Sequence, residues 1–246
     1  SASRLRSREN MMIGVIITHI DNSFYARILQ GINDAVASRG YAILALSSGE
    51  DLDQESTLVR TLGANRVSGM IIVPSRDMIN TLDYDRLGIP HIMIVRKGNL
   101  NTGSYFINDS YRSGVLAAEH FLRKDRHNPA YLGFNLPVTC NQERETGFFD
   151  TLRTAGYPLL DQRRVYCSAT EEAAYNTTLA LLTNDERIDS LFVYNDLMAI
   201  GALKAIRDRG FRIPDDIAVL GHDDVAVAPY LEPPLSTIRV PKYRLG

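Results

Sequence analysis

Polar side chains suited to binding a small hydrophilic molecule stand where several predicted strands end. Ser75, Asn195 and Asp223 each follow a short apolar run that is typical of a buried strand. Arg144 lies near the start of a predicted helix, after a strand and a loop. Carboxylates accept hydrogen bonds from hydroxyl groups, and a guanidinium donates through a planar fork. These residue types could therefore hold a polyol-like ligand.

Each of these residues also has an ordinary structural interpretation. Asn195 could cap a helix, contact a ligand, or do both, because asparagine is a good N-cap. Asp223 could instead cap a helix or accept from a buried amide, and Arg144 could be a surface residue or pair with Glu143. Asp109 could cap the helix that begins near residue 110. These alternatives stay open at the level of sequence.

Signatures of catalysis are missing from the sequence. It contains no G-x-G dinucleotide motif, no P-loop, no G-x-S-x-G elbow and no H-E-x-x-H motif. The five histidines do not sit at metal-binding spacings, and Cys140 and Cys167 show no C-x-x-C pattern. We therefore expect no enzyme activity, no cofactor and no metal, and reduced thiols in a cytoplasmic protein.

Composition is that of an ordinary globular chain. Of 246 residues, 45% are hydrophobic and 23% are charged, and the net charge of -2 gives no signal for nucleic acid or membranes. No apolar run reaches the roughly 18 residues of a membrane span, and the first residues lack the apolar region of a secretory signal.

Short β-rich runs alternate with longer segments of helical periodicity. The predicted strands are 13–18, 41–46, 69–73, 90–95, 130–134, 164–167, 190–194 and 217–221. Repeated strand–helix units predict an α/β fold with parallel sheets and helices on both faces. Two such runs, separated by the polar stretch 123–128, predict two Rossmann-like subdomains with a ligand cleft between them.

One long motif carries a specific resemblance. NDLMAIGA at 195–202 is followed by Gly210, Pro214-Asp215, GHDD at 221–224 and PPLST at 233–237. In order and spacing this run resembles the LacI/GalR family of transcription regulators. The resemblance implies a periplasmic-binding-protein type I fold and the effector-binding, dimer-forming domain of a DNA-binding repressor. The alternative is a sugar-binding protein of a periplasmic transport system, which shares this bilobed fold.

The resemblance also implies roles for individual residues. Arg144 corresponds to a ligand-clamping arginine, and Asp223, Asn195 and Asp109 correspond to polar positions at the effector site. Phe24 and Tyr25 occupy the position of a lid over the ligand, although an aromatic pair there is often core.

Other positions bear on the nature of the ligand. Ser75 resembles a serine contact of the family. Val138 stands where some relatives carry an arginine for a charged or purine ligand, so we expect a neutral, sugar-like effector. His222 replaces an aromatic residue of the family and is expected to be a satisfied, semi-buried histidine, and Asp224 to be structural.

The N-terminal residues resemble the end of the family's hinge helix. Leu5 corresponds to the leucine that wedges into the DNA minor groove. The helix-turn-helix that precedes the hinge in the family is absent, which suggests part of a longer protein. We predict a hinge remnant at 1–10, an N-terminal subdomain at 11–124 with 239–246, and a C-terminal subdomain at 125–238, assembled as a homodimer or tetramer.

Overall fold

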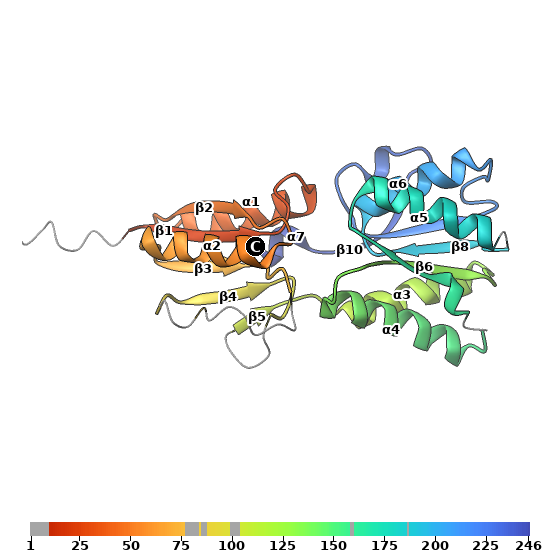
Figure 1. Cartoon of the computed structure of the whole chain (residues 1–246), viewed down its shortest axis with the longest axis horizontal. Coiled ribbons are helices and arrows are strands. Elements are labelled where there is room, and N and C mark those ends of the chain that lie inside the picture. Colours follow the sequence, from red (N-terminus) through yellow and green to blue (C-terminus); the bar gives the residue numbers. More distant parts are fainter. Residues whose placement is uncertain (1–9, 77–83, 85–87, 99–103, 158–159, 186) are drawn as a thin grey trace, which may run out of the picture. The chain divides into compact units, whose positions relative to one another are not determined.

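Strands and helices alternate along the chain, and the strands form two five-stranded sheets in which every pair is parallel (Figure 1). The structure is a computed structural model that describes residues 10–76, 84, 88–98, 104–157, 160–185 and 187–246. Contacts divide the chain into two units, Ser1–Asn108 with Pro241–Gly246, and Asp109–Val240. The predicted α/β class with two parallel sheets is confirmed.

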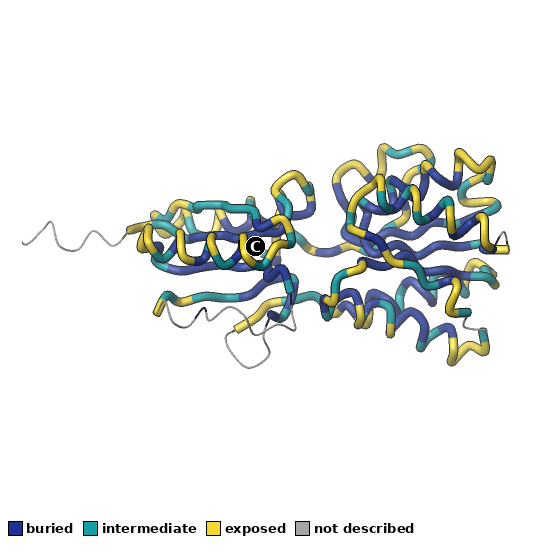
Figure 2. The backbone as a smooth tube through the Cα atoms, in the orientation of Figure 1, coloured by how far each residue is buried: buried dark blue, intermediate teal, exposed yellow. Residues whose placement is uncertain are grey.

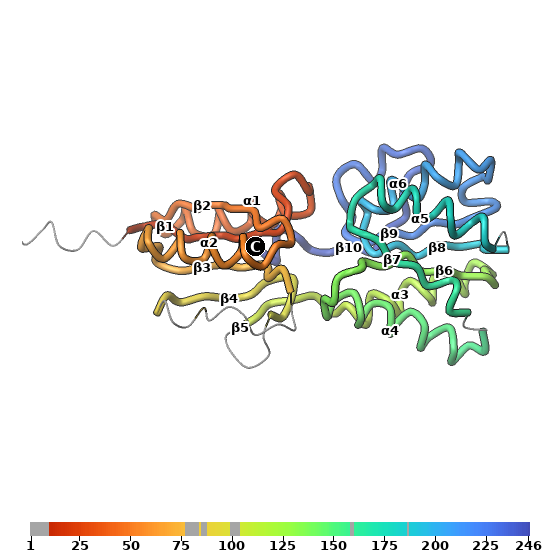
Figure 3. Tube along the Cα trace, in the orientation of Figure 1, coloured from red at the N-terminus to blue at the C-terminus, as the bar shows by residue number. Residues whose placement is uncertain are grey.

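The first unit contains a sheet in the order β2-β1-β3-β4-β5. Its strands are β1 (Met12–Ile17), β2 (Ala42–Ser47), β3 (Gly69–Ile72), β4 (His91–Ile94) and β5 (Ser104–Phe106). Its helices are α1 (Ser23–Ala37), α2 (Leu52–Ala64) and α7 (Lys242–Leu245). The last helix is added when the chain returns after the second sheet, and it packs on α1 (Figure 3).

Local sequence explains where the helices of the first unit begin. The Asn22 side chain accepts from the Phe24 amide, and the Asp51 side chain accepts from the amides of Asp53 and Gln54. Such side chains satisfy amide groups that have no partner inside the helix. Apolar residues of α2, of strands β1, β3 and β4 and of two connecting segments form a core cluster, which comprises Ile16, Val59, Leu62, Val67, Met70, Ile72, Tyr84 and Met93.

The second unit contains a sheet in the order β10-β9-β8-β6-β7. Its strands are β6 (Pro129–Phe134), β7 (Arg164–Cys167), β8 (Ser190–Val193), β9 (Ala218–Asp223) and β10 (Ser236–Arg239). Its helices are α3 (Ser110–Arg123), α4 (Thr139–Thr154), α5 (Glu171–Asn184) and α6 (Asp196–Asp208), with short 3-10 turns at Asp161–Arg163 and Ala228–Tyr230. The strands β6 and β8 are buried along their whole length, as a fully covered parallel sheet requires (Figure 2).

Two facing glycines let α3 and α4 cross at close range. A Cβ atom on Gly114 would lie 2.0 Å from the Arg144 carbonyl oxygen, and one on Gly147 would lie 2.1 Å from the Tyr111 carbonyl oxygen. A side chain at either position would push the helices apart. The crossing therefore fixes the backbone that carries Arg144.

The structure differs from the sequence analysis in two places. Helix α3 packs on α4 and belongs to the second unit, so the units divide at Asn108 and Asp109 rather than near residue 124. The polar stretch at 123–128 is only the turn between α3 and β6. Strands β5 and β10 were not predicted, because their sequences, SYF and STIR, contain no apolar run of the kind that marks the other strands.

Within the described part of the chain, no helix combines the length and the apolar character needed to cross a membrane.

Candidate functional site

Polar residues of the second unit gather at the carboxyl edge of its sheet, where ligands of parallel α/β sheets usually bind. Strands β6, β8 and β9 are neighbours and end at Phe134, Val193 and Asp223. Helix α4 starts shortly after β6 and carries Arg144 in its second turn, while Tyr194 and Asn195 follow β8 directly. The βα connections thus bring the predicted residues Arg144, Asn195 and Asp223 to one edge.

Arg144 is a buried guanidinium that no carboxylate of the described residues pairs with. Its residue is only 5% exposed, and Nη1 donates to the Tyr194 carbonyl oxygen. The guanidinium carbon lies 4.8 Å from the centroid of the Tyr194 ring. Its Nε atom is buried and has no hydrogen-bond partner, and among the described residues Arg144 forms no ion pair. Because a buried, incompletely satisfied cation is costly, this side chain is a candidate for binding oxygen atoms of a ligand.

The Tyr194 ring that contacts the Arg144 guanidinium is itself packed against an aromatic ring and a sulfur atom. The Tyr194 ring stacks on Phe134 with 5.3 Å between centroids, and its hydroxyl lies 3.6 Å from the Cys140 sulfur. These contacts hold the ring on which Arg144 rests, so the arginine is positioned before any ligand arrives.

Asp223 carries backbone strain at the end of β9. Its φ angle is 121°, and that of Asp224 is 56°, both unusual for residues with a side chain. Strain of this kind costs about 1–3 kcal/mol and tends to occur at functional sites. The Asp223 carboxylate lies 2.9 Å from Nδ1 of His222, whose Nε2 lies 3.4 Å from the Ser113 hydroxyl.

His222 is buried more deeply than the semi-buried position expected of it, and Asp224 makes the structural contacts that were expected. His222 is 2% exposed with a polar partner at each ring nitrogen, as a satisfied histidine would be. Asp224 accepts from Nε of Arg239 at 2.7 Å, and its amide donates to the Thr237 hydroxyl, so its contacts here are structural.

Asn195 and Asp109 are helix caps in this structure. The Asn195 side chain accepts from the Met198 amide at 2.9 Å, and the Asp109 side chain accepts from the Arg112 amide at 2.7 Å. Asn195 is buried and Asp109 is exposed. A contact with ligand by either residue stays a prediction.

Asp196 was missed by the sequence analysis although it organises this edge. Its fully buried carboxylate accepts from the Val225 amide at 2.9 Å and from the Thr237 hydroxyl at 2.7 Å. Only glycine fits beside it, because a Cβ on Gly221 would lie 2.1 Å from the carboxylate. An aspartate shortly after β8, together with a glycine inside β9, was the feature of the sequence that could have predicted this buried carboxylate.

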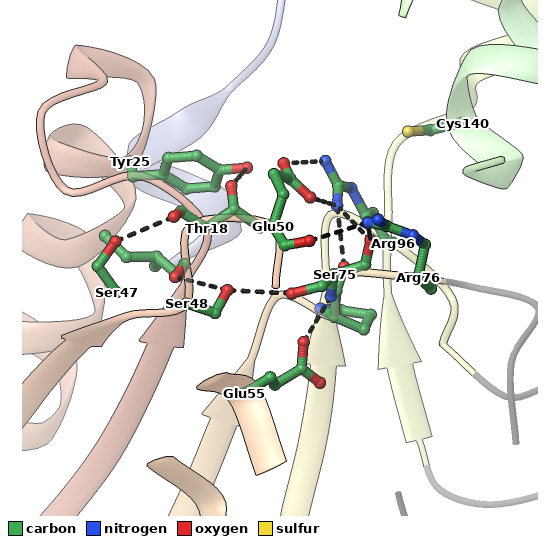
Figure 4. A network of polar contacts seen from close by, with 12 residues as sticks. Thr18, Tyr25, Ser47, Ser48, Glu50, Glu55, Ser75, Arg76, Arg96 and Cys140 are labelled. Atoms are coloured by element: carbon green, nitrogen blue, oxygen red, sulfur yellow. Dashed lines mark hydrogen bonds and ion pairs between the residues drawn. The ribbon is translucent and has the colours of Figure 1, made fainter. Parts of the chain in front are cut away.

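The carboxyl edge of the first unit holds a dense hydrogen-bond network (Figure 4). The predicted contact residue Ser75 is fully buried there. Its amide donates to Glu55 at 2.6 Å, and its hydroxyl lies 3.1 Å from that of Ser48. The Tyr84 hydroxyl also donates to Glu55, and burial, followed by the charge of Glu55, raises the pKa of Tyr84 far above its usual range. The described hydrogen bonds of Ser75 lie within this network, and its contact with a ligand stays a prediction.

Glu50 and Arg96 form a buried ion pair that the sequence analysis missed. Nη1 and Nη2 of Arg96 donate to the two carboxylate oxygens of Glu50 at 2.7 Å and 2.8 Å, and Nη1 also donates to the Pro74 carbonyl oxygen at 3.0 Å (Figure 4). The pair ties together the loops that follow β2, β3 and β4. Arg96 follows β4 almost directly, so the rule that selected Ser75 could have found it.

Phe24 and Tyr25 open α1 and are each 5% exposed. Their rings meet edge to face at 5.1 Å, and the Thr18 hydroxyl donates to the Tyr25 hydroxyl at 2.9 Å. Both rings are packed into the first unit, in keeping with the core alternative. Their role as a lid stays a prediction. Leu5, the predicted hinge residue, lies outside the described residues.

Two other kinds of site come into question, a surface hollow and a metal centre. A hollow of about 420 Å³ in the second unit is lined by the C-terminal end of α3 and by the starts of β9 and β10, which places it away from the carboxyl edge. In the ranges that the structure describes, no cluster of three or more histidine, cysteine or acidic side chains could hold a metal ion.

Comparisons with known proteins agree with the architecture. The periplasmic binding protein-like domain family matches residues 118–246, more than half of the chain. The HTH-type transcriptional repressor PurR of Mannheimia succiniciproducens is 29% identical over 252 residues, covering 100% of this chain and 74% of the relative.

Two solved structures share the fold. The transcriptional regulator CelR, in complex with cellobiose, superposes with a TM-score of 0.86 at 23% identity, covering 99% of this chain and 78% of that one. A LacI family regulator from Enterococcus faecium with bound ribose superposes with a TM-score of 0.84 at 24% identity, covering 95% of this chain and 85% of that one. The chain belongs to the periplasmic binding protein-like domain family, and its resemblance to LacI/GalR regulators is confirmed.

Proposed function

We propose that this chain is the effector-sensing part of a DNA-binding transcriptional repressor. The molecule sensed is a small sugar or sugar derivative. The observation that carries the proposal is Arg144, a buried guanidinium at the carboxyl edge with one buried donor atom unused. The relatives are transcriptional repressors, and two neighbours in structure hold cellobiose and ribose. No observation favours the transport alternative.

Each group at the two carboxyl edges has a distinct task in this proposal. Arg144 donates to ligand oxygens, and Asp223 accepts from ligand hydroxyls while His222 orients its carboxylate. Asn195 and Asp109 hold helix starts and can contribute a second polar contact. Phe24, Tyr25 and Ser75 would serve from the first unit only if ligand binding exposes them, because each is almost fully buried here.

Binding would act on DNA affinity by favouring one of two arrangements of the complete regulator. A ligand shifts such an equilibrium only by its differential affinity for the two states, typically by about 1–3 kcal/mol. The affinity of a complete homodimeric regulator for its operator should therefore change by about 5- to 150-fold when the ligand is added. An unchanged affinity at saturating ligand would refute the sensing role.

Thermal-shift screening against a sugar library, followed by calorimetry, tests the binding site. A ligand present at about 100 times its dissociation constant stabilises the folded state by about 2.7 kcal/mol. Arg144→Met should abolish the shift. Arg153→Met, on the same helix but exposed and paired with Asp150, should leave it intact. Equal binding by Arg144→Met and the unmodified chain would remove Arg144 from the site.

A further inference from the structure

Arg76 lies in the loop that follows β3, on the carboxyl edge of the first unit (Figure 4). Its Nη1 atom donates to the Glu50 carbonyl oxygen at 3.0 Å and to the Ser75 carbonyl oxygen at 2.8 Å. Two main-chain anchors on a single nitrogen fix the plane of the guanidinium. They leave Nε and Nη2, a pair of donors that can bind two oxygen atoms side by side, without a partner among the described residues.

The charge of Arg76 is not paired locally. Glu50 is the neighbouring acid, yet both of its carboxylate oxygens are engaged by Arg96, at 2.7 Å and 2.8 Å. The contacts of Arg76 are carbonyl oxygens, which are dipoles and not charges. In the described part of the chain it forms no ion pair, and the residue is half-buried. A cation held in a fixed orientation with two donors available is a receptor for an anion.

Hydrogen bonds to Ser75 hold the loop that carries Arg76 in place. The Ser48 and Ser75 hydroxyls lie 3.1 Å apart, and Glu55 accepts from the Ser75 amide at 2.6 Å. Glu50 and Val95 both adopt left-handed backbone angles, with φ of 64° and 68°. Such a conformation is rare for a β-branched residue, and strain of this kind tends to be retained at functional sites.

We propose that Arg76 pairs with an anionic group, a phosphate or a carboxylate, on the molecule that this regulator senses. The inference rests on the proposed function and names the chemical class of its ligand as an acidic sugar derivative. It departs from the neutral ligand expected from Val138. That side chain is fully buried, so its apolar character reflects packing and not the charge of a ligand.

The test compares neutral and acidic forms of the same sugar skeleton. Glucose, its phosphate monoester and gluconate, with the corresponding three forms of ribose, are titrated by calorimetry into the unmodified chain and into Arg76→Gln. Arg60→Gln is the matched control, because Arg60 is an exposed arginine on α2 whose only described contact is the Thr57 hydroxyl. Arg76→Lys keeps the charge and removes the fork.

An acidic form should bind the unmodified chain about 10- to 100-fold more tightly than its neutral parent, the value of a charge-assisted contact. Arg76→Gln should reduce that ratio to about one, Arg76→Lys should give an intermediate ratio, and Arg60→Gln should preserve it. The identity of the preferred form, phosphate or carboxylate, distinguishes the two anions.

Three results would overturn the inference, and they are distinguishable. Arg144-dependent binding of a neutral sugar at least as tight as that of its acidic forms, or an acid preference that survives in Arg76→Gln, would reject the role of Arg76 and leave the proposed function standing. Absence of binding by every neutral and acidic form would reject the sugar-sensing function together with this inference. Thermal melting of Arg76→Gln without ligand shows that the variant is folded.

Discussion

The carboxyl edges of the two sheets present arginines in opposite electrostatic situations. In the first unit, the charge of buried Arg96 is paired with the carboxylate of Glu50. In the second unit, equally buried Arg144 contacts a carbonyl oxygen and an aromatic face, and no carboxylate of the described residues pairs with it. The first arrangement is an ion pair within the fold that connects three loops. The second is the one that we propose a ligand completes, so burial alone does not distinguish a structural arginine from a candidate binding one.

The same substitution at the two arginines should therefore have opposite effects on stability. Arg96→Met leaves the Glu50 carboxylate, which is only 12% exposed, without its partner. Removing one member of a buried pair lowers the free energy of unfolding by about 3–5 kcal/mol, which urea denaturation would measure. A double variant that also carries Glu50→Gln should recover most of the loss. A change below about 1 kcal/mol for Arg96→Met would mean that the pair behaves as a surface ion pair.

Gly114→Ala tests whether the second edge depends on a rigid helix crossing. The added methyl group would lie 2.0 Å from the Arg144 carbonyl oxygen and 2.6 Å from the Phe148 amide nitrogen. Forcing α3 and α4 apart should cost about 1–3 kcal/mol in unfolding free energy and should weaken ligand binding because Arg144 moves. Gly69→Ala is the control, since its nearest neighbours would lie at ordinary distances of 3.4 Å and 3.5 Å. Equal melting temperatures for both variants would show that the crossing tolerates a side chain.

Arg144→Met should stabilise the protein in the absence of ligand, by about 1 kcal/mol, while abolishing ligand binding. An apolar side chain of similar length removes a buried charge that nothing in its surroundings matches. The melting temperature without ligand is the decisive measurement, and Arg153→Met is the matched control. A loss of stability would indicate that the contacts with Tyr194 already satisfy the guanidinium, which would erase the contrast between the two edges.

The smallest expected effect comes from His120, in the second unit but away from its carboxyl edge. Partial burial, followed by the charges of Arg123 and Lys124, lowers the pKa of His120 below its ordinary 6.5. The unfolded chain then binds a proton more readily than the folded one, so stability falls as pH decreases below 6.5 and is fully retained above it.

His120→Gln should flatten the change in melting temperature between about pH 7.5 and about pH 5.5 without altering ligand affinity at neutral pH. The unmodified chain measured over the same range is the reference. An unchanged pH profile would assign the acid sensitivity elsewhere in the molecule.

Local sequence was sufficient to predict most of the strands and several helix caps. The alternation of apolar runs with helical periods predicted eight of the strands, because their sequences are rich in apolar or β-branched residues, whereas SYF of β5 and STIR of β10 contain no such run. Asp109 and Asn195 were recognised as possible caps, because the amide from which each side chain accepts a hydrogen bond lies only three residues further along the chain. The same connectivity rule placed Arg144 and Asp223 at one sheet edge, since the carboxyl ends of neighbouring parallel strands must meet.

The hydrophobic pattern of the sequence could not predict contacts between residues that are distant in the chain. Glu50 and Arg96 are separated by 46 positions, and Asp196 meets Thr237 across 41. Nothing in the spacing of these residues indicates that they pair, because their proximity depends on the order of strands in each sheet. The membership of α3 in the second unit likewise follows from its glycine crossing with α4.

Sequence therefore determined which residue types reach the two edges, and tertiary structure decided which of their charges are matched. The electrostatic state of an arginine depends on what lies within a few ångströms of it. For Arg96 that is a carboxylate from another loop, and for Arg144 it is a carbonyl group and a ring. Only the folded chain brings those neighbours together.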